Sequence, residues 1–265
     1  MIFVPGTAPG DRVRVRVVEE HGNYARAALI HRCAPGPVHR DAPCPWVDRC
    51  GGCPWQHVAY ATQLAAKEVN VREALARIAG VTATEPLPII AAPAEWAYRH
   101  RIRLHAGAGG ALGYRRPRSH ELVVIEHCMI AEPALSAVLA PLRALVPALA
   151  TALAEVEILT NGRGGVVVDA TAHGRFREPD EPVIAAWLDA HPTVAGLAVR
   201  GRDWARHYGA TALAVASEAD VPPAVQRAGT FTQVNPEANR LLVRTVVDFA
   251  GAGARVLDLF AAPAT

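Results

Sequence analysis

The sequence of 265 residues has few cysteines, few aromatic residues and almost no lysine. It contains five cysteines, aromatic residues make up 6% of it, and all but one of its 27 basic residues are arginine. No run of eighteen apolar residues occurs and the first residues lack the pattern of a signal peptide, so we expect a cytoplasmic protein with no membrane contact. In a reducing compartment, clustered thiols are more often metal ligands or redox groups than disulfides.

The overall composition is that of a folded protein whose net charge does not identify a partner. The 27 basic and 25 acidic residues nearly cancel, and hydrophobic residues make up 51% of the chain. This hydrophobic content supports one or more sizeable cores and excludes a largely disordered chain. The length of the chain is sufficient for two domains.

Hydrophobic periodicity predicts a multidomain α+β protein. A small β unit is expected from the alternation in residues 11–18 and a second strand over 24–30. Helices are expected over 60–79, 134–153 and 237–249, with strands within 98–125 and at 164–170, 194–201, 210–217 and 254–260. The last helix and strand follow each other as they do at the start of a doubly wound α/β domain. The predicted domains are therefore residues 1–37, 38–225 and 226–265.

Three of the five cysteines fall within ten positions, in the pattern C-x5-C-x2-C formed by Cys44, Cys50 and Cys53. The glycine pair inside the last interval lets the backbone wrap closely around a bulky centre. A tetrahedral thiolate site needs a fourth ligand, for which Cys128 is the natural candidate, with His57 and Cys33 as alternatives. One cysteine triplet plus a distant single cysteine favours an iron–sulfur cluster modestly over zinc, and spacing alone leaves both open.

Arginines alternate along the strand expected near residue 100. Arg99, Arg101 and Arg103 should therefore face one way, and a second group follows at the next turn, made of Arg115, Arg116 and Arg118. With Tyr98 and Tyr114 interleaved, this pattern is typical of phosphate contact and base stacking, although a solvated sheet face fits it equally well. The glycine-rich segment 161–165 precedes a strand rather than a helix, and we interpret it as a turn.

Several motifs, in order, resemble the RNA uracil-5-methyltransferase family, which includes iron–sulfur 23S rRNA methyltransferases and tRNA-modifying relatives. These motifs are C-x5-CGGC followed by QH, a YxxQLxxK helix, YRHRIRLH, and LGYRRPRSHELVVIEHC. The segment FVPGTAPGDRVRVRV resembles the later half of the family's TRAM domain, an OB-like RNA-binding barrel. FTQVNPEAN, residues 231–239, resembles the entry to its Rossmann-like catalytic domain, which depends on S-adenosylmethionine.

The resemblance implies cofactors, a partner and site residues. A [4Fe–4S] cluster would be held by Cys44, Cys50, Cys53 and Cys128. The protein would be a monomer that binds RNA, with rRNA as the favoured class. Phe231 would be a stacking platform for the target base, Asn235 would fix its loop, and Gln233 and Asp258 would contact S-adenosylmethionine. The RNA contacts would include the arginines at positions 99, 101, 103, 115 and 116.

The family's reaction needs a cysteine thiolate that adds to uracil C6 and a carboxylate base that removes the C5 proton. No catalytic residue of this kind has a counterpart in the sequence, and Ala262 and Ala264 stand where the family has cofactor-binding glycines. We therefore expect a family member truncated at both ends that does not methylate RNA unaided, with the helix over 60–79 packing on the catalytic domain. Two alternatives are a non-catalytic iron–sulfur module that binds RNA and a zinc-stabilised structural protein.

Overall fold

The computed structural model describes residues 1–215, 224–227 and 229–251, together with 253, 255, 257 and 259. Asp258 and most of the strand expected over 254–260 lie outside the described residues. Among the described helices, none has both the length and the apolar character that a membrane crossing requires.

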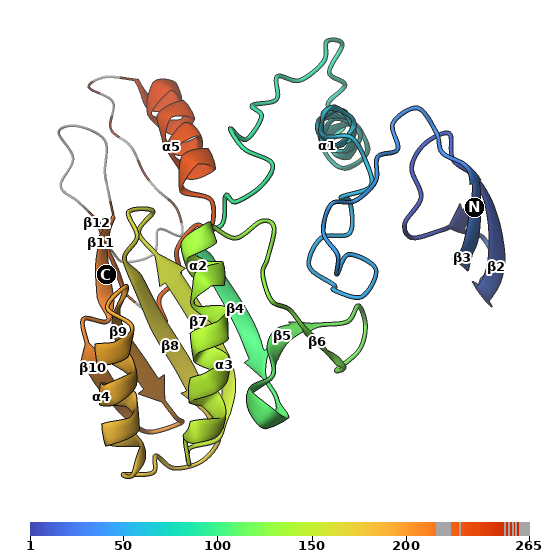
Figure 1. The fold of residues 1–265 in the computed structure, drawn as a ribbon. Coiled ribbons are helices and arrows are strands. Elements are labelled where there is room, and N and C mark those ends of the chain that lie inside the picture. The colour runs from blue at the N-terminus through green and yellow to red at the C-terminus, as the bar shows by residue number, and fades with distance from the viewer. Residues whose placement is uncertain are drawn as a thin grey trace.

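A three-stranded sheet forms the N-terminal part of the chain (Figure 1). Its strands, β1 (Ile2–Phe3), β2 (Arg12–Glu20) and β3 (Ala25–Ala34), lie in the order β1-β3-β2, with β2 and β3 antiparallel. The strand expected over 11–18 and its successor are thus confirmed. In the first half of β2 the valines are half-buried and the arginines exposed, as the alternation predicts.

Helix α1 (Tyr60–Ala74) continues into one π-helical turn (Leu75–Ala79), which confirms the helix expected over 60–79. Gly80 ends it with a φ of 67°, in the left-handed region that glycine adopts without strain. No residue of α1 or its π-turn is buried, and α1 stands apart from the large sheet (Figure 1). Its packing on a catalytic domain remains a prediction.

The central part of the chain is a seven-stranded sheet in the order β10-β9-β8-β7-β4-β5-β6. The strands are β4 (Arg101–Ala106), β5 (Leu112–Arg115), β6 (Leu122–Val124), β7 (Leu153–Thr160), β8 (Val166–Ala172), β9 (Val194–Arg200) and β10 (Ala205–Gly209). Neighbouring strands are antiparallel except β8 and β9, which are parallel and joined through helix α4 (Asp180–Ala190). A 3-10 turn (Ala108–Gly110) connects β4 to β5.

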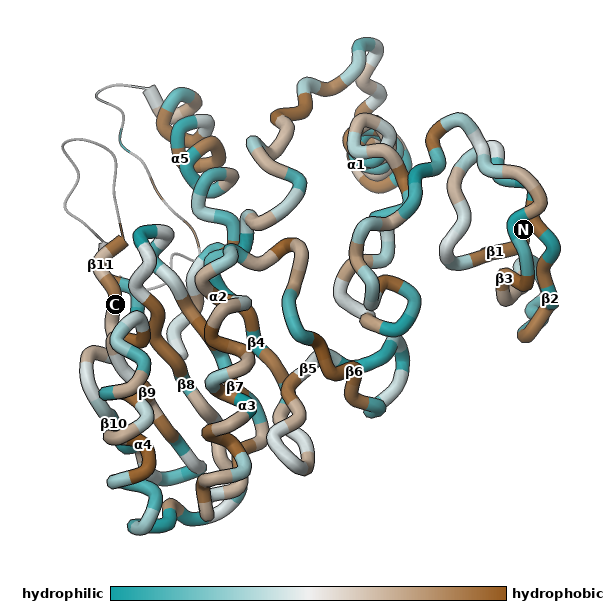
Figure 2. The backbone as a smooth tube through the Cα atoms, in the orientation of Figure 1, coloured by the Kyte–Doolittle hydropathy of each residue, from teal (hydrophilic) through white to brown (hydrophobic). Residues whose placement is uncertain are grey.

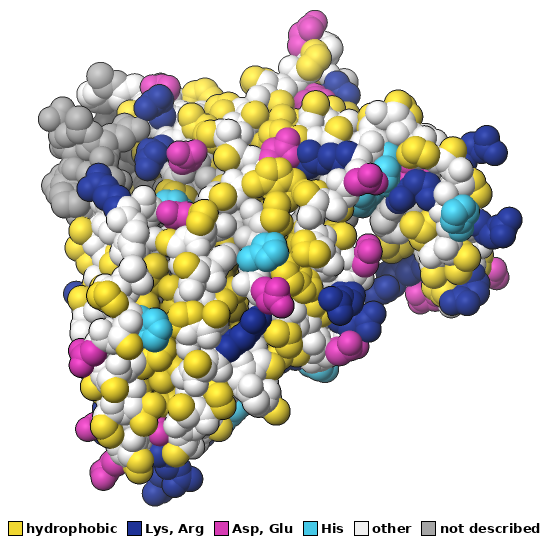
Figure 3. Space-filling view, viewed as in Figure 1, with side chains coloured by type: hydrophobic (Ala, Val, Ile, Leu, Met, Phe, Trp, Pro, Cys, Tyr) yellow, Lys and Arg dark blue, Asp and Glu magenta, His cyan; other side chains and the backbone are white. Residues whose placement is uncertain are grey.

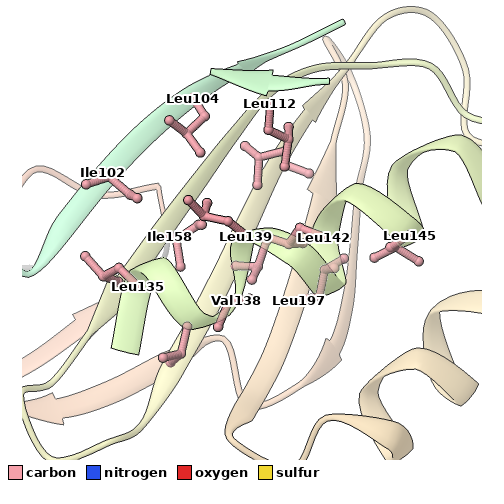
Figure 4. Packing of buried hydrophobic residues seen from close by; sticks show 14 of the residues in the cluster. Ile102, Leu104, Leu112, Leu135, Val138, Leu139, Leu142, Leu145, Ile158 and Leu197 are labelled. Atoms are coloured by element: carbon pink, nitrogen blue, oxygen red, sulfur yellow. The ribbon is translucent and has the colours of Figure 1, made fainter. Parts of the chain in front are cut away.

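Helices α2 (Pro133–Ala137), α3 (Leu139–Ala148) and α4 cover one face of this sheet and bury the main core (Figures 1 and 4). Leu139, Leu142 and Leu145 of α3 recur at helical spacing and are each at most 2% exposed. They pack with Ile102 and Leu104 of β4. The brown colour of hydrophobic residues is accordingly most frequent along the inner strands of the sheet (Figure 2).

The helix expected over 134–153 is too long, because α3 ends at Ala148 and β7 begins at Leu153. Pro147 lies in the last turn, and the buried carboxylate of Asp180 accepts the backbone N–H groups of Ala150 (2.7 Å) and Thr151 (2.8 Å). These bonds give the chain an alternative to helical hydrogen bonds. The sequence analysis also missed β7, α4 and β10.

Beyond the sheet, a hairpin and a helix complete the described chain. The hairpin pairs β11 (Ala212–Val215) with β12 (Ala224–Arg227), and helix α5 (Pro236–Ala250) confirms the helix expected over 237–249. Asn235 caps α5 by accepting the N–H of Ala238 at 3.0 Å.

Candidate functional site

Four cysteines, three from one loop and one from a distant part of the chain, line one cavity. Cys44, Cys50, Cys53 and Cys128 surround a volume of about 60 Å³, several times the ~10–15 Å³ that one water molecule needs. Of the two alternative ligands, Cys33 is exposed on β3, and the ring of His57 lies 3.0 Å from the backbone oxygen of Thr7. The structure therefore brings together the four cysteines expected from the sequence.

The cysteine loop, residues 44–57, is folded around Trp46. The carbonyl oxygen of Trp46 accepts the N–H of Cys50 at 2.7 Å, which closes a tight turn between the first two cysteines. The Trp46 side chain is 9% exposed and meets the ring of His127 edge-on, with centroids 4.6 Å apart. Because His127 precedes Cys128, this contact holds the distant cysteine beside the loop.

Gly51 fixes the loop to the large sheet. Its N–H donates to the carbonyl oxygen of Arg115 at 3.1 Å. A Cβ at this position would lie only 3.1 Å from that same oxygen. The close backbone approach thus explains one glycine of the pair inside the last cysteine interval.

Hydrogen-bond donors surround three of the thiols. Burial raises the pKa of Cys50 and of Cys53, while the Gly52 N–H and the Gln56 side chain, respectively, act in the opposite direction. Burial likewise raises the pKa of Tyr114, whose hydroxyl bonds to Cys128. Such donors favour the thiolate form that a metal centre requires.

Arg99 also faces this cavity rather than the open sheet. It lies just before β4, and its backbone forms an isolated parallel β-bridge with that of Ala131. Its side chain lines the cavity, where the positive charge of the guanidinium acts to lower the pKa of Cys53. Its Nε is buried and has no hydrogen-bond partner among the described residues. A buried cationic donor beside thiols is suited to balancing the negative charge of a thiolate-bound centre.

The other predicted arginines lie on two separate surfaces. Arg101 and Arg103 of β4 both approach the buried carboxylate of Glu157, at 3.9 Å and 2.9 Å. On the β5–β6 hairpin, the Arg115 side chain bonds to His120, and Arg116 pairs with Glu121 at 2.9 Å. Basic side chains gather near this hairpin and over the N-terminal sheet in Figure 3.

The segment FTQVN is attached to the start of β4. Arg101 donates to the carbonyl oxygen of Thr230 at 2.8 Å, and the His100 N–H donates to that of Val234 at 2.9 Å. The Arg101 guanidinium lies 5.7 Å from the centroid of the Phe231 ring, which is 78% exposed. Phe231 is thus held at its base and presented to solvent, and Gln233 is also exposed.

Comparisons with known proteins agree with these features. A family model described as TRAM domain matches residues 1–30. The 23S rRNA (uracil(1939)-C(5))-methyltransferase RlmD of Shewanella amazonensis is 29% identical over 98% of this chain and 60% of its own length. An uncharacterised RNA methyltransferase of Thermosynechococcus vestitus is 42% identical over 54% of this chain and 32% of its own. The chain is therefore similar in sequence to RNA uracil-5-methyltransferases.

A solved structure has a similar fold. The tRNA (uracil-54, C5)-methyltransferase of Pyrococcus abyssi, crystallised with S-adenosyl-L-homocysteine, superposes with a TM-score of 0.69 at 20% identity. The match covers 95% of this chain and 61% of the archaeal chain. These two proteins match nearly all of this chain, which spans about 60% of their own length.

Sequence reasoning missed the roles of several residues around the thiols. Gln56 was noted only as part of the QH pair that follows the cysteines, Trp46 has no pattern that marks it, and Tyr114 was expected to stack on bases rather than to line the cavity. The alternation along β5 carries a signal for Tyr114, because Arg115 beside it is exposed and Tyr114 must then point the other way.

Proposed function

We propose that this chain carries the RNA-recognition and cluster-binding part of an S-adenosylmethionine-dependent methyltransferase that modifies uracil C5 in 23S rRNA. The observation that carries this proposal is Phe231, an exposed aromatic ring clamped through Arg101 and Thr230 to a rigid strand. An enzyme that acts on a base within folded RNA must take the base out of its stack, and a fixed aromatic ring can fill or continue that stack. Both an rRNA enzyme and a tRNA enzyme match nearly the whole chain, and the higher identity to the rRNA enzyme, 29% against 20%, favours rRNA.

The residues of the site have separate proposed roles. Arg101 orients Phe231 through the backbone of Thr230, while Asn235 fixes the start of α5. The exposed Arg103 and Arg116 offer positive charge to phosphates. Gln233, next to Phe231, and Asp258, outside the described residues, are proposed contacts for S-adenosylmethionine.

The cysteine cavity fits a [4Fe–4S] cluster better than a single ion. A zinc ion with Zn–S bonds of about 2.3 Å would draw its four sulfurs to within about 4 Å of each other. Thiolates that each bind a different corner of a cluster instead lie around a cavity, as these four do.

When bound, the cluster would supply a rigid cross-link between the cysteine loop and Cys128. Gln56, Tyr114 and Arg99 would orient and balance the thiolates. Anaerobic purification tests this assignment through iron and sulfide content and the optical spectrum. Four irons per chain, lost in Cys128→Ser and kept in Cys33→Ser, are expected; a colourless protein with one zinc would refute the cluster.

RNA recognition is tested by equilibrium binding at one fixed salt concentration. We expect the chain to bind a 23S rRNA fragment containing the target uridine at least tenfold more tightly than a tRNA. Phe231→Ala should weaken binding to the rRNA fragment by about fivefold or more, because one base–aromatic stack is worth about 1–3 kcal/mol. The exposed Phe249→Ala, at the far end of α5, is the matched control. Equal affinity for both RNAs would remove the rRNA assignment.

A further inference from the structure

A groove that adjoins the cysteine cavity, and shares Gly52, Cys53 and Gln56 with it, is also lined by a motif that neither the cluster nor Phe231 accounts for. The groove has a volume of about 610 Å³ and lies between the cysteine loop, α1, the segment 92–98 and the start of α5. Tyr60, Gln63 and Lys67 of α1 all line it, at the spacing that places them on one helix face. These are the polar residues of the YxxQLxxK motif.

Two of the three motif residues build the groove walls. The Tyr60 hydroxyl accepts the N–H of Ala92 at 2.9 Å, which anchors the segment opposite α1. The Gln63 amide donates to the carbonyl oxygens of Trp55 (3.1 Å) and Val58 (2.8 Å), which fixes the end of the cysteine loop. The groove is therefore a formed feature with rigid walls.

Trp55 connects this groove to a second one. A groove of about 400 Å³ between residues 4–9 and α1 is also lined by Trp55 and Gln63. Trp55 is 45% exposed, an unusual position for so large an apolar ring. The two grooves together, here called the α1 trough, run from the TRAM segment past Trp55 to Asn235.

The charge of the α1 trough is positive. Its lining carboxylate, Glu95, pairs with Arg40 at 2.7 Å, and the Arg40 guanidinium lies 5.7 Å from the centroid of the Trp96 ring. Lys67 is exposed and has no ion-pair partner within the described part of the chain. The capped N-terminus of α5 adds the positive end of a 15-residue helix at Asn235.

We propose that the α1 trough binds a single-stranded RNA segment that flanks the target uridine, with a base stacked on Trp55 and a phosphate on Lys67. This inference rests on the proposed function, because it requires an RNA substrate. Exposed aromatic rings along a cationic groove are the pattern by which proteins bind single strands. The trough joins the TRAM segment to the FTQVN segment, so a strand lying in it would lead towards Phe231.

The test measures the affinity of the chain for the 23S rRNA fragment at several salt concentrations. We expect Trp55→Ala to weaken binding about tenfold, and Trp55→Tyr, which keeps a stacking ring, to restore most of the loss. Lys67→Ala should reduce the slope of log Kd against log salt by about 0.7, the value for one phosphate contact on a single strand. Arg77→Ala, which removes an exposed charge from the π-turn after α1, is the matched control and should leave the slope unchanged.

The outcomes separate this inference from the proposed function. If the unaltered chain does not bind the fragment, the proposed RNA function fails. If the chain binds but Trp55→Ala and Lys67→Ala behave like Arg77→Ala, the trough does not bind RNA and the inference is overturned. This result is the one expected if a protein segment, rather than RNA, occupies the trough. An ultraviolet cross-link from a 5-iodouridine flanking the target to Trp55 would support it independently.

Discussion

Replacing Asp11 by asparagine should destabilise the N-terminal sheet and its junction with the cysteine loop. The Asp11 side chain is 1% exposed. Its carboxylate accepts the N–H groups of Ala8 (2.9 Å) and Gly36 (2.7 Å), and Arg32 and His39 lie at 3.0 Å and 3.3 Å. One carboxylate thus ties the start of β2 to the segment that leads into the cysteine loop.

The magnitude follows from the pKa of Asp11. Burial alone would raise it, but the two backbone N–H groups, Arg32 and His39 outweigh burial and lower the pKa from 3.8 to about 2. A shift of nearly two units corresponds to about 2 kcal/mol of folding free energy. An asparagine would lose this and would direct its NH2 group at another donor, so we expect a loss of about 2–3 kcal/mol.

The sign of the pH dependence supplies the assay. Since the folded pKa lies below the unfolded one, the stabilisation is fully present above about pH 4 and is lost as the pH falls towards 2. Urea unfolding of the wild type and Asp11→Asn should therefore differ most at neutral pH and converge in acid. The exposed Asp41→Asn is the control. A difference below about 0.5 kcal/mol at pH 7, or one that stays constant down to pH 2.5, would refute this account of the carboxylate.

Three further changes test other parts of the structure. Leu142→Ala should destabilise the main core by about 2–5 kcal/mol in denaturant unfolding, because its side chain is 1% exposed and leaves a cavity; a loss below 1 kcal/mol would contradict the packing. Gly51→Ala should lower the iron content of anaerobically purified protein, since the new Cβ would push against the Arg115 carbonyl, whereas full iron content would show that the loop tolerates the shift. Asn235→Ala should cost about 1 kcal/mol through the lost cap and speed amide exchange in the first turn of α5; unchanged exchange there would argue against the cap.

Elements with a local signal were predictable from the sequence. Helix α1 and helix α5 each carry helical apolar spacing, and α1 ends at Gly80, so they were found within a few residues. β7 was missed because a preceding apolar helix runs towards it with no glycine between them. What ends that helix is Asp180, thirty residues further along the chain, and no local pattern reveals such a partner.

The candidate site shows the same division between local and distant information. Cysteine spacing identified three of the thiols that line the cavity and left Cys128 as the candidate for the fourth. The alternation of Arg99, Arg101 and Arg103, in contrast, predicted that all three arginines share one face. In the structure β4 begins at Arg101, and Arg99, paired with Ala131, lies against the cysteines instead. The strand boundary therefore decides which arginine meets the thiols, and a strand boundary is the feature that sequence patterns locate least well.

The cysteine loop is the junction between otherwise separate parts of the chain. It bonds to the N-terminal segment through His57 and Thr7, to the large sheet through Gly51 and Arg115, and to α1 through Trp55 and Gln63. A residue set that fixes this loop consequently fixes the relative placement of the TRAM segment, the sheet and the α1 trough. The proposed uracil methylation needs no electron transfer, so we infer that the four cysteines hold the proposed RNA-binding surfaces in a fixed position relative to Phe231.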